Sequence, residues 1–81
     1  MNMAVLIKYN SGPAVLLRNA RRLEAYIRAF GQPIIEKISG GLKLNLIYSK
    51  KIDKGYKPKL QTFDLIIGDD EREVVEFEVI E

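Results

Sequence analysis

The feature that most constrains the fold is a run of apolar residues spaced alternately four and three apart between positions 13 and 30. At this spacing they share one face of a helix: Leu16, Ala20, Leu23, Ile27 and Phe30. The opposite face carries four arginines, which are Arg18, Arg21, Arg22 and Arg28. The pattern therefore predicts an amphipathic helix over 13–30, with one side in the core and one cationic side.

The residues at both ends of this stretch are typical of helix boundaries. Pro13 suits a first helical turn because its φ is already helical and its missing N–H is not needed there. Ser11 or Gly12 is then expected to be the N-cap. Gly31 favours a left-handed C-cap, and Pro33 prevents the helix from continuing.

Five other stretches have the alternation or the apolar density of strands, and they cover residues 3–9, 33–39, 42–49, 60–67 and 72–80. Gly40 and Gly41 predict a hairpin, because both can take positive φ without penalty, and residues 68–71 predict a turn. We expect a single α+β domain over residues 1–81. Its one amphipathic helix would pack on a mixed, largely antiparallel sheet of about five strands, in the order β-α-β-β-β-β.

The first strand, the helix and the second strand are expected to form a right-handed parallel crossover. One helix can cover only one face of such a sheet. The other face would display Leu6, Ile47, Ile66 and Ile80 among charged side chains. A half-apolar face of this kind predicts a homodimer through the sheet face. The size of the chain favours the same conclusion, because a domain of 81 residues buries a small core and is usually stabilised further by disulfides, metals or oligomerisation. Without Cys a disulfide is impossible, and without Cys and His a zinc site is not expected, which leaves oligomerisation.

Charge is distributed unevenly along the chain. Residues 1–59 hold twelve Lys or Arg against three acids, a net of +9, whereas residues 60–81 hold one Arg against eight acids, a net of −7. The two parts together give the formal net charge of +2. Such asymmetry indicates a polyanionic partner, or two surfaces of opposite sign that attract each other.

A segment rich in lysine, residues 50–59, follows the third predicted strand and contains Tyr56. Lysine and tyrosine alternate there in the manner that suits single-stranded nucleic acids, in which bases stack on rings and phosphates meet cations. The candidate phosphate-contacting residues outside the helix are Lys43, Lys50, Lys51, Lys54, Tyr56, Lys57 and Lys59. The expected function is a small module that binds DNA or RNA. The alternatives are that these charges only solvate the surface, or that the chain is a protein-interaction or assembly module.

Catalysis has little support in the sequence. Without His or Cys, the commonest general base and two standard nucleophiles are missing, and no nucleotide-binding glycine motif is present. The acids Asp64, Asp69 and Asp70 leave open a metal-dependent nuclease, although turns and edge strands favour acids for structural reasons. We expect no enzyme, no cofactor, no bound metal and no small-molecule substrate. The lack of a long apolar run or a secretory signal predicts a cytoplasmic protein away from membranes.

Overall fold

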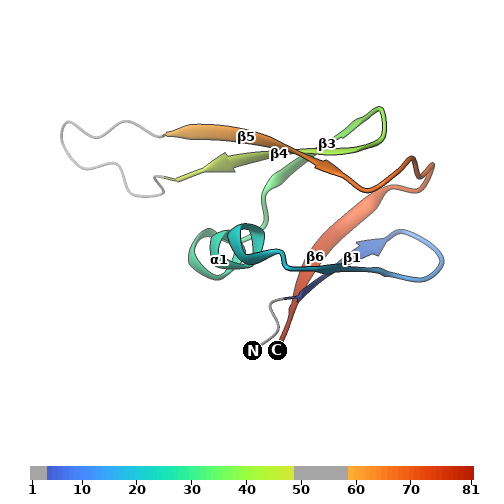
Figure 1. Cartoon of the computed structure of the whole chain (residues 1–81), viewed down its shortest axis with the longest axis horizontal. Coiled ribbons are helices and arrows are strands. Elements are labelled where there is room, and N and C mark those ends of the chain that lie inside the picture. Colours follow the sequence, from blue (N-terminus) through green and yellow to red (C-terminus); the bar gives the residue numbers. More distant parts are fainter. Residues whose placement is uncertain (1–3, 49–58) are drawn as a thin grey trace. The chain divides into compact units, whose positions relative to one another are not determined.

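A computed structural model describes residues 4–48 and 59–81, which form one helix and six strands (Figure 1). The chain divides into two compact units, one of residues 1–32 with 71–81 and one of residues 33–70. Each unit contains one three-stranded antiparallel sheet. The predicted α+β class, with a helix lying against a sheet, is confirmed. The described residues form six strands in two sheets, rather than five in one.

The first unit is built around β1 (Ala4–Tyr9), which pairs with β2 (Val15–Arg18) on one side and β6 (Val74–Ile80) on the other. The helix α1 (Arg21–Phe30) lies against β1. The core of this unit consists of five buried side chains from these elements: Val5, Ile7, Leu23, Tyr26 and Phe77. Ile7 and Phe77 lie directly opposite each other in the β1–β6 register, so both point to the helix side of the sheet.

The helix is shorter than predicted. It begins at Arg21 rather than Pro13, and its N-cap is Ala20 rather than Ser11 or Gly12. Residues Val15–Arg18 are instead β2, which forms a hairpin with β1. A short apolar run such as residues 15–17 can satisfy either period, and here pairing with the adjacent β1 overrides the helical spacing.

One feature precedes β2 and another follows it. Arg72 donates hydrogen bonds of 2.8 Å from Nη1 to the carbonyl oxygens of Ser11 and Pro13, which fixes the β1–β2 loop. Asn19 has φ +59, a left-handed conformation that asparagine tolerates better than most residues. The chain turns at Asn19, and the helix starts two residues later.

The predicted apolar face of the helix is therefore only partly correct. Leu23 is buried, and Ile27 and Phe30 are half-buried. Leu16 lies in β2 and is 43% exposed, so it is not part of a helical face. Tyr26 is buried instead and stacks on Phe30, with ring centroids 5.2 Å apart.

The second unit contains β3 (Ile34–Ile38), β4 (Gly41–Ile47) and β5 (Leu60–Ile66), with β4 in the centre. The alternation predicted for β4 is confirmed, because Leu42, Leu44 and Leu46 are buried while the residues between them are half-buried.

The predicted hairpin between β3 and β4 is also present, but its loop is shifted by one residue. Ile38 pairs with Gly41, so the loop residues are Ser39 and Gly40, and Gly40 has φ +83. Gly41 is the first residue of β4. A Cβ at Gly41 would lie 2.0 Å from the carbonyl oxygen of Leu65, so glycine is needed there for the close approach of β5.

The predicted parallel crossover is wrong. β1 and β3 belong to different sheets, and every strand pairing among the described residues is antiparallel. The half-apolar face expected from Leu6, Ile47, Ile66 and Ile80 is not the face of one sheet, because these residues are divided between the two sheets.

The last strand contains an irregularity that alternation alone does not predict. Lys8 pairs with Glu76 and Tyr9 pairs with Val74, so the register shifts between them and Val75 is the extra residue. Strict alternation along the predicted strand 72–80 places Val75 on the core side with Phe77 and Val79, but Val75 is 63% exposed. Phe77 is buried as predicted, and Val79 is half-buried.

Candidate nucleic-acid interface

Three of the four predicted arginines gather at the junction between β2 and α1. Arg18 is the last residue of β2, and Arg21 and Arg22 are the first two residues of α1. All three are exposed. The expected arginine ridge along one helix is therefore replaced by three exposed arginines within five residues, Arg18, Arg21 and Arg22, which we call the junction cluster.

The junction cluster lies at the N-terminus of α1, with Arg18 before the N-cap residue and Arg21 and Arg22 in the first turn. The N-cap residue Ala20 makes no side-chain cap hydrogen bond, and the backbone bond from Glu24 N–H to the Ala20 carbonyl, 2.8 Å long, is an early bond of the helix. The N–H groups of the first turn have no intrahelical acceptor, and this end of the helix dipole is positive. Arginines are unfavourable at this position by themselves, whereas an anion would be favourable.

Arg28 differs from the other three because it is paired within its own unit. Its Nε is ion-paired with Glu24 one turn earlier, and its Nη2 lies 3.1 Å from Oε1 of Glu81. Hydrogen bonds to Glu24 and then Glu81 raise the pKa of Arg28 above its ordinary value. Glu24 is only 5% exposed, so Arg28 also neutralises a buried carboxylate. A phosphate would have to compete with these carboxylates for Arg28.

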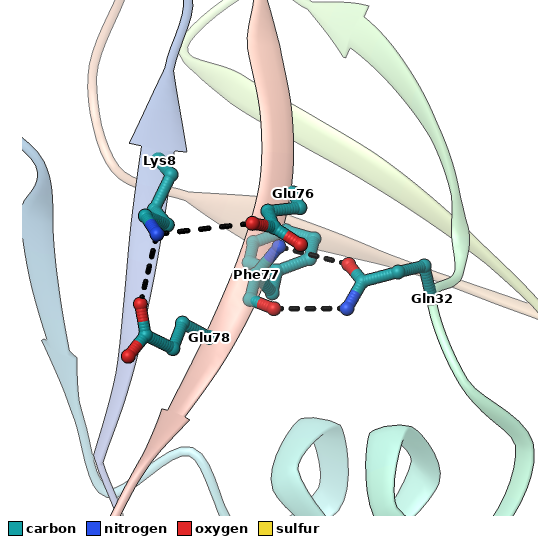
Figure 2. Close-up of polar contacts among 5 residues, drawn as sticks. All are labelled: Lys8, Gln32, Glu76, Phe77 and Glu78. Atoms are coloured by element: carbon teal, nitrogen blue, oxygen red, sulfur yellow. Dashed lines mark hydrogen bonds and ion pairs between the residues drawn. The ribbon is translucent and has the colours of Figure 1, made fainter.

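Lys8 on β1 is neutralised in the same way (Figure 2). Its Nζ lies 3.0 Å from Oε1 of Glu78 and 3.8 Å from Oε1 of Glu76, both on the adjacent β6. The hydrogen bond and charge of Glu78, with a smaller effect of Glu76, raise the pKa of Lys8. The acidic tail therefore does meet part of the basic front of the chain, as the charge asymmetry indicated.

The predicted lysines of the second unit have a different setting. Lys43 lies in the middle of β4, directly between Glu36 on β3 and Asp64 on β5, so acids flank it on both sides. Lys59 is exposed beside β5, and its carbonyl oxygen accepts the Tyr48 N–H at 2.9 Å. The rest of the predicted segment lies outside the described residues, namely Lys50, Lys51, Lys54, Tyr56 and Lys57.

The acids considered for a metal site serve other contacts. The Oδ1 atom of Asp69 accepts the Gly40 N–H at 2.7 Å, which holds the β3–β4 turn. The Gly40 carbonyl in turn accepts the N–H groups of Ile67 and Gly68. Asp64 faces Lys43 across the ladder. Within residues 4–48 and 59–81, no three acidic side chains are grouped so as to hold a metal ion.

Arg72 has a role that sequence reasoning missed. Its guanidinium carbon lies 4.0 Å from the centroid of the Tyr9 ring, and it also holds the Ser11 and Pro13 carbonyl groups. Arg72 is the single basic residue of the acidic tail, which is the only sequence signal that sets it apart. Its contacts join the start of β6 to the end of β1.

No protein-family model, curated protein or solved structure matches this chain. In the parts of the chain that the structure describes, no helix has the length and apolarity needed to cross a membrane.

Proposed function

We propose that the protein binds nucleic acid through the phosphate groups, and that the junction cluster is its main contact in the first unit. The observation that carries this proposal is the placement of Arg18, Arg21 and Arg22 at a helix N-terminus that has no side-chain cap hydrogen bond. Guanidinium groups bind phosphate oxygens through paired N–H donors, and the helix dipole adds to the attraction.

The contrast with the other basic residues of the unit supports the choice of site. Lys8 and Arg28 each have two carboxylate partners. Among the described residues, by comparison, no carboxylate lies within ion-pair distance of Arg18 or Arg21. Placing three cations close together raises the potential at the junction, and a polyanion lowers it.

The alternative function, an assembly module without a nucleic-acid ligand, makes a different prediction for the same residues. In an assembly module the arginines only solvate the surface, so replacing them changes no binding event. A titration that follows both nucleic-acid binding and molecular mass separates the two functions.

The test is a fluorescence anisotropy titration with labelled single-stranded and duplex oligonucleotides at low salt. The wild-type chain is compared with Arg18→Ala/Arg21→Ala. The matched control is Lys8→Ala/Lys37→Ala, which removes the same charge away from the junction. We expect the arginine variant to bind several-fold more weakly than the control. Absence of binding by the wild-type chain, or an equal loss in both variants, would overturn the proposal.

A further inference from the structure

The strand β5 has an outer edge with little protection against pairing. It is seven residues long and, among the described strands, its one neighbour is β4. Asp64 is its single charged residue, and it contains no proline. Its end residues are large and apolar, with Leu60 64% and Ile66 71% exposed. A long edge strand with these properties is a template for pairing with another strand.

The other outer strands are protected. The side-chain amide of Gln32 occupies the edge of β6, donating to the Phe77 carbonyl at 2.9 Å and accepting the Phe77 N–H at 2.8 Å (Figure 2). β6 also carries two glutamates, β3 carries Glu36 and Lys37, and β2 has only four residues and ends in Arg18. β5 is therefore the exception among the four outer strands.

We propose that β5 pairs with β5 of a second copy of this chain, antiparallel and about a two-fold axis that passes through Phe63. In this register Leu60 lies opposite Ile66 of the second copy, and Thr62 lies opposite Asp64 of the second copy. The two-fold axis produces each pair twice. The two most exposed apolar residues of β5 cover each other, and the hydroxyl of Thr62 can donate to the carboxylate of Asp64.

Neighbouring registers do not have this complementarity. Moving the axis to residue 64 puts the two Asp64 carboxylates opposite each other, which is destabilising in a cross-strand pair. Moving it to residue 62 puts Leu60 opposite Asp64. The sequence Leu-Gln-Thr-Phe-Asp-Leu-Ile is thus self-complementary about its central residue, which is the reason for choosing a second copy as the partner.

The result is one continuous six-stranded sheet made of two copies of β3–β4–β5. Its backbone hydrogen bonds use N–H and C=O groups that a free edge would leave to water. This homodimer differs from the one expected from the sequence, because it uses a strand edge rather than a sheet face. It does not depend on nucleic-acid binding, and each proposal can fail without the other.

The first experiment measures molecular mass by light scattering over a range of protein concentrations. The wild-type chain, 9.3 kDa as a monomer, is expected to reach twice that mass. Thr62→Asp places a new carboxylate opposite Asp64 of the second copy and should raise the dissociation constant at least tenfold. Thr62→Asp/Asp64→Thr exchanges the two partners and should restore the dimer. Ser39→Asp, an exposed turn change, is the charge control and should leave the mass unchanged.

The second experiment uses the absence of cysteine from the native chain. Phe63→Cys places one thiol on each side of the axis, at a Cα separation of about 4.5–5.5 Å for directly opposed residues, which a disulfide can span. Mild oxidation should then cross-link two chains, whereas the exposed control Val75→Cys should not. A wild-type chain that stays monomeric at every concentration overturns the proposal. So does a dimer that neither Thr62→Asp weakens nor Phe63→Cys cross-links.

Discussion

In the β2–β1–β6 sheet, polar side chains bond across the strands and cover the outer edge of β6, whereas in the β3–β4–β5 sheet the outer strand β5 carries a single charged residue, Asp64. Lys8 bridges two strands, Gln32 closes the edge of β6, and Arg72 holds the β1–β2 loop. In the second sheet, the Asp69–Gly40 bond lies at the β3–β4 turn and Asn45 of β4 donates to Glu36 of β3 at 3.1 Å, while β5 is an outer strand with little protection.

The difference shows that counting charges does not reveal which charges are available. The first unit contains many basic residues, but Lys8 and Arg28 are ion-paired with glutamates. Arg72 donates to two backbone carbonyl groups and lies over the Tyr9 ring. Arg18 and Arg21 of the junction cluster are exposed, and among the described residues no carboxylate lies within ion-pair distance of either. The second unit instead presents the outer edge of β5. The two units therefore offer different surfaces to a partner.

The largest effect should come from the core of the first unit. Phe77→Ala removes a side chain that is 1% exposed and should cost about 3–5 kcal/mol of the free energy of unfolding. Val75→Ala, on the bulge two residues earlier, should change it by less than about 0.5 kcal/mol. Urea denaturation followed by circular dichroism measures both. Equal costs at the two positions would mean that the bulge is misplaced.

A smaller but still substantial effect is expected at the β4–β5 contact of the second unit. Gly41→Ala puts a methyl group against the Leu65 carbonyl and should destabilise the chain by about 1–3 kcal/mol, because backbone has to move. Ser39→Ala, in the adjacent turn, is the control and should be nearly neutral. Thermal melts distinguish them. A neutral Gly41→Ala would show that β5 does not approach β4 as closely as described.

The edge of β6 provides a direct test of the protection by Gln32. Gln32→Ala removes two hydrogen bonds to Phe77 and should cost about 1–2 kcal/mol. Amide exchange of Phe77 should accelerate, because its N–H loses its acceptor. Gln61→Ala on the exposed part of β5 serves as the control. Unchanged exchange of the Phe77 amide in Gln32→Ala would show that Gln32 does not protect the edge of β6, which would then be as open as the edge of β5.

The smallest effect should be the pH dependence contributed by Lys8. Its pKa is raised above 10.5 in the folded state, so its stabilising contribution is complete below pH 10.5 and is lost as the pH rises through the folded value. Lys8→Met should therefore flatten the fall of the melting temperature as the pH is raised above 10.5. Lys37→Met, at an exposed position, should not. Identical slopes for the wild type and Lys8→Met would show that the ion pairs contribute nothing.

Much of the fold was predictable from the sequence because its signals were local. The alternation of Leu42, Leu44 and Leu46 identified a buried strand face, and Gly40 identified the hairpin. Residues 15–18 were mispredicted because a short apolar run fits two periods, and only the neighbouring strand β1 decides between them. The parallel crossover failed for the related reason that strand partners are not encoded locally.

The candidate site was less predictable than the fold. The sequence identified Arg18, Arg21 and Arg22 as basic, but it placed them with Arg28 on one ridge. Their separation depends on Asn19, which turns the chain, and on Glu24 and Glu81, which neutralise Arg28. The contact to Glu81 spans 53 positions of the chain, and no spacing rule relates such distant residues.

The salt dependence of oligonucleotide binding tests the central claim most directly. Each phosphate contact releases condensed counterions, so the affinity of the wild-type chain should fall as salt rises. Removing two contacts in Arg18→Ala/Arg21→Ala should reduce the magnitude of the log–log slope by about 1.4 on single strands or about 1.8 on duplex. The same slope for the wild type and the arginine variant would contradict a phosphate-binding role for the junction cluster.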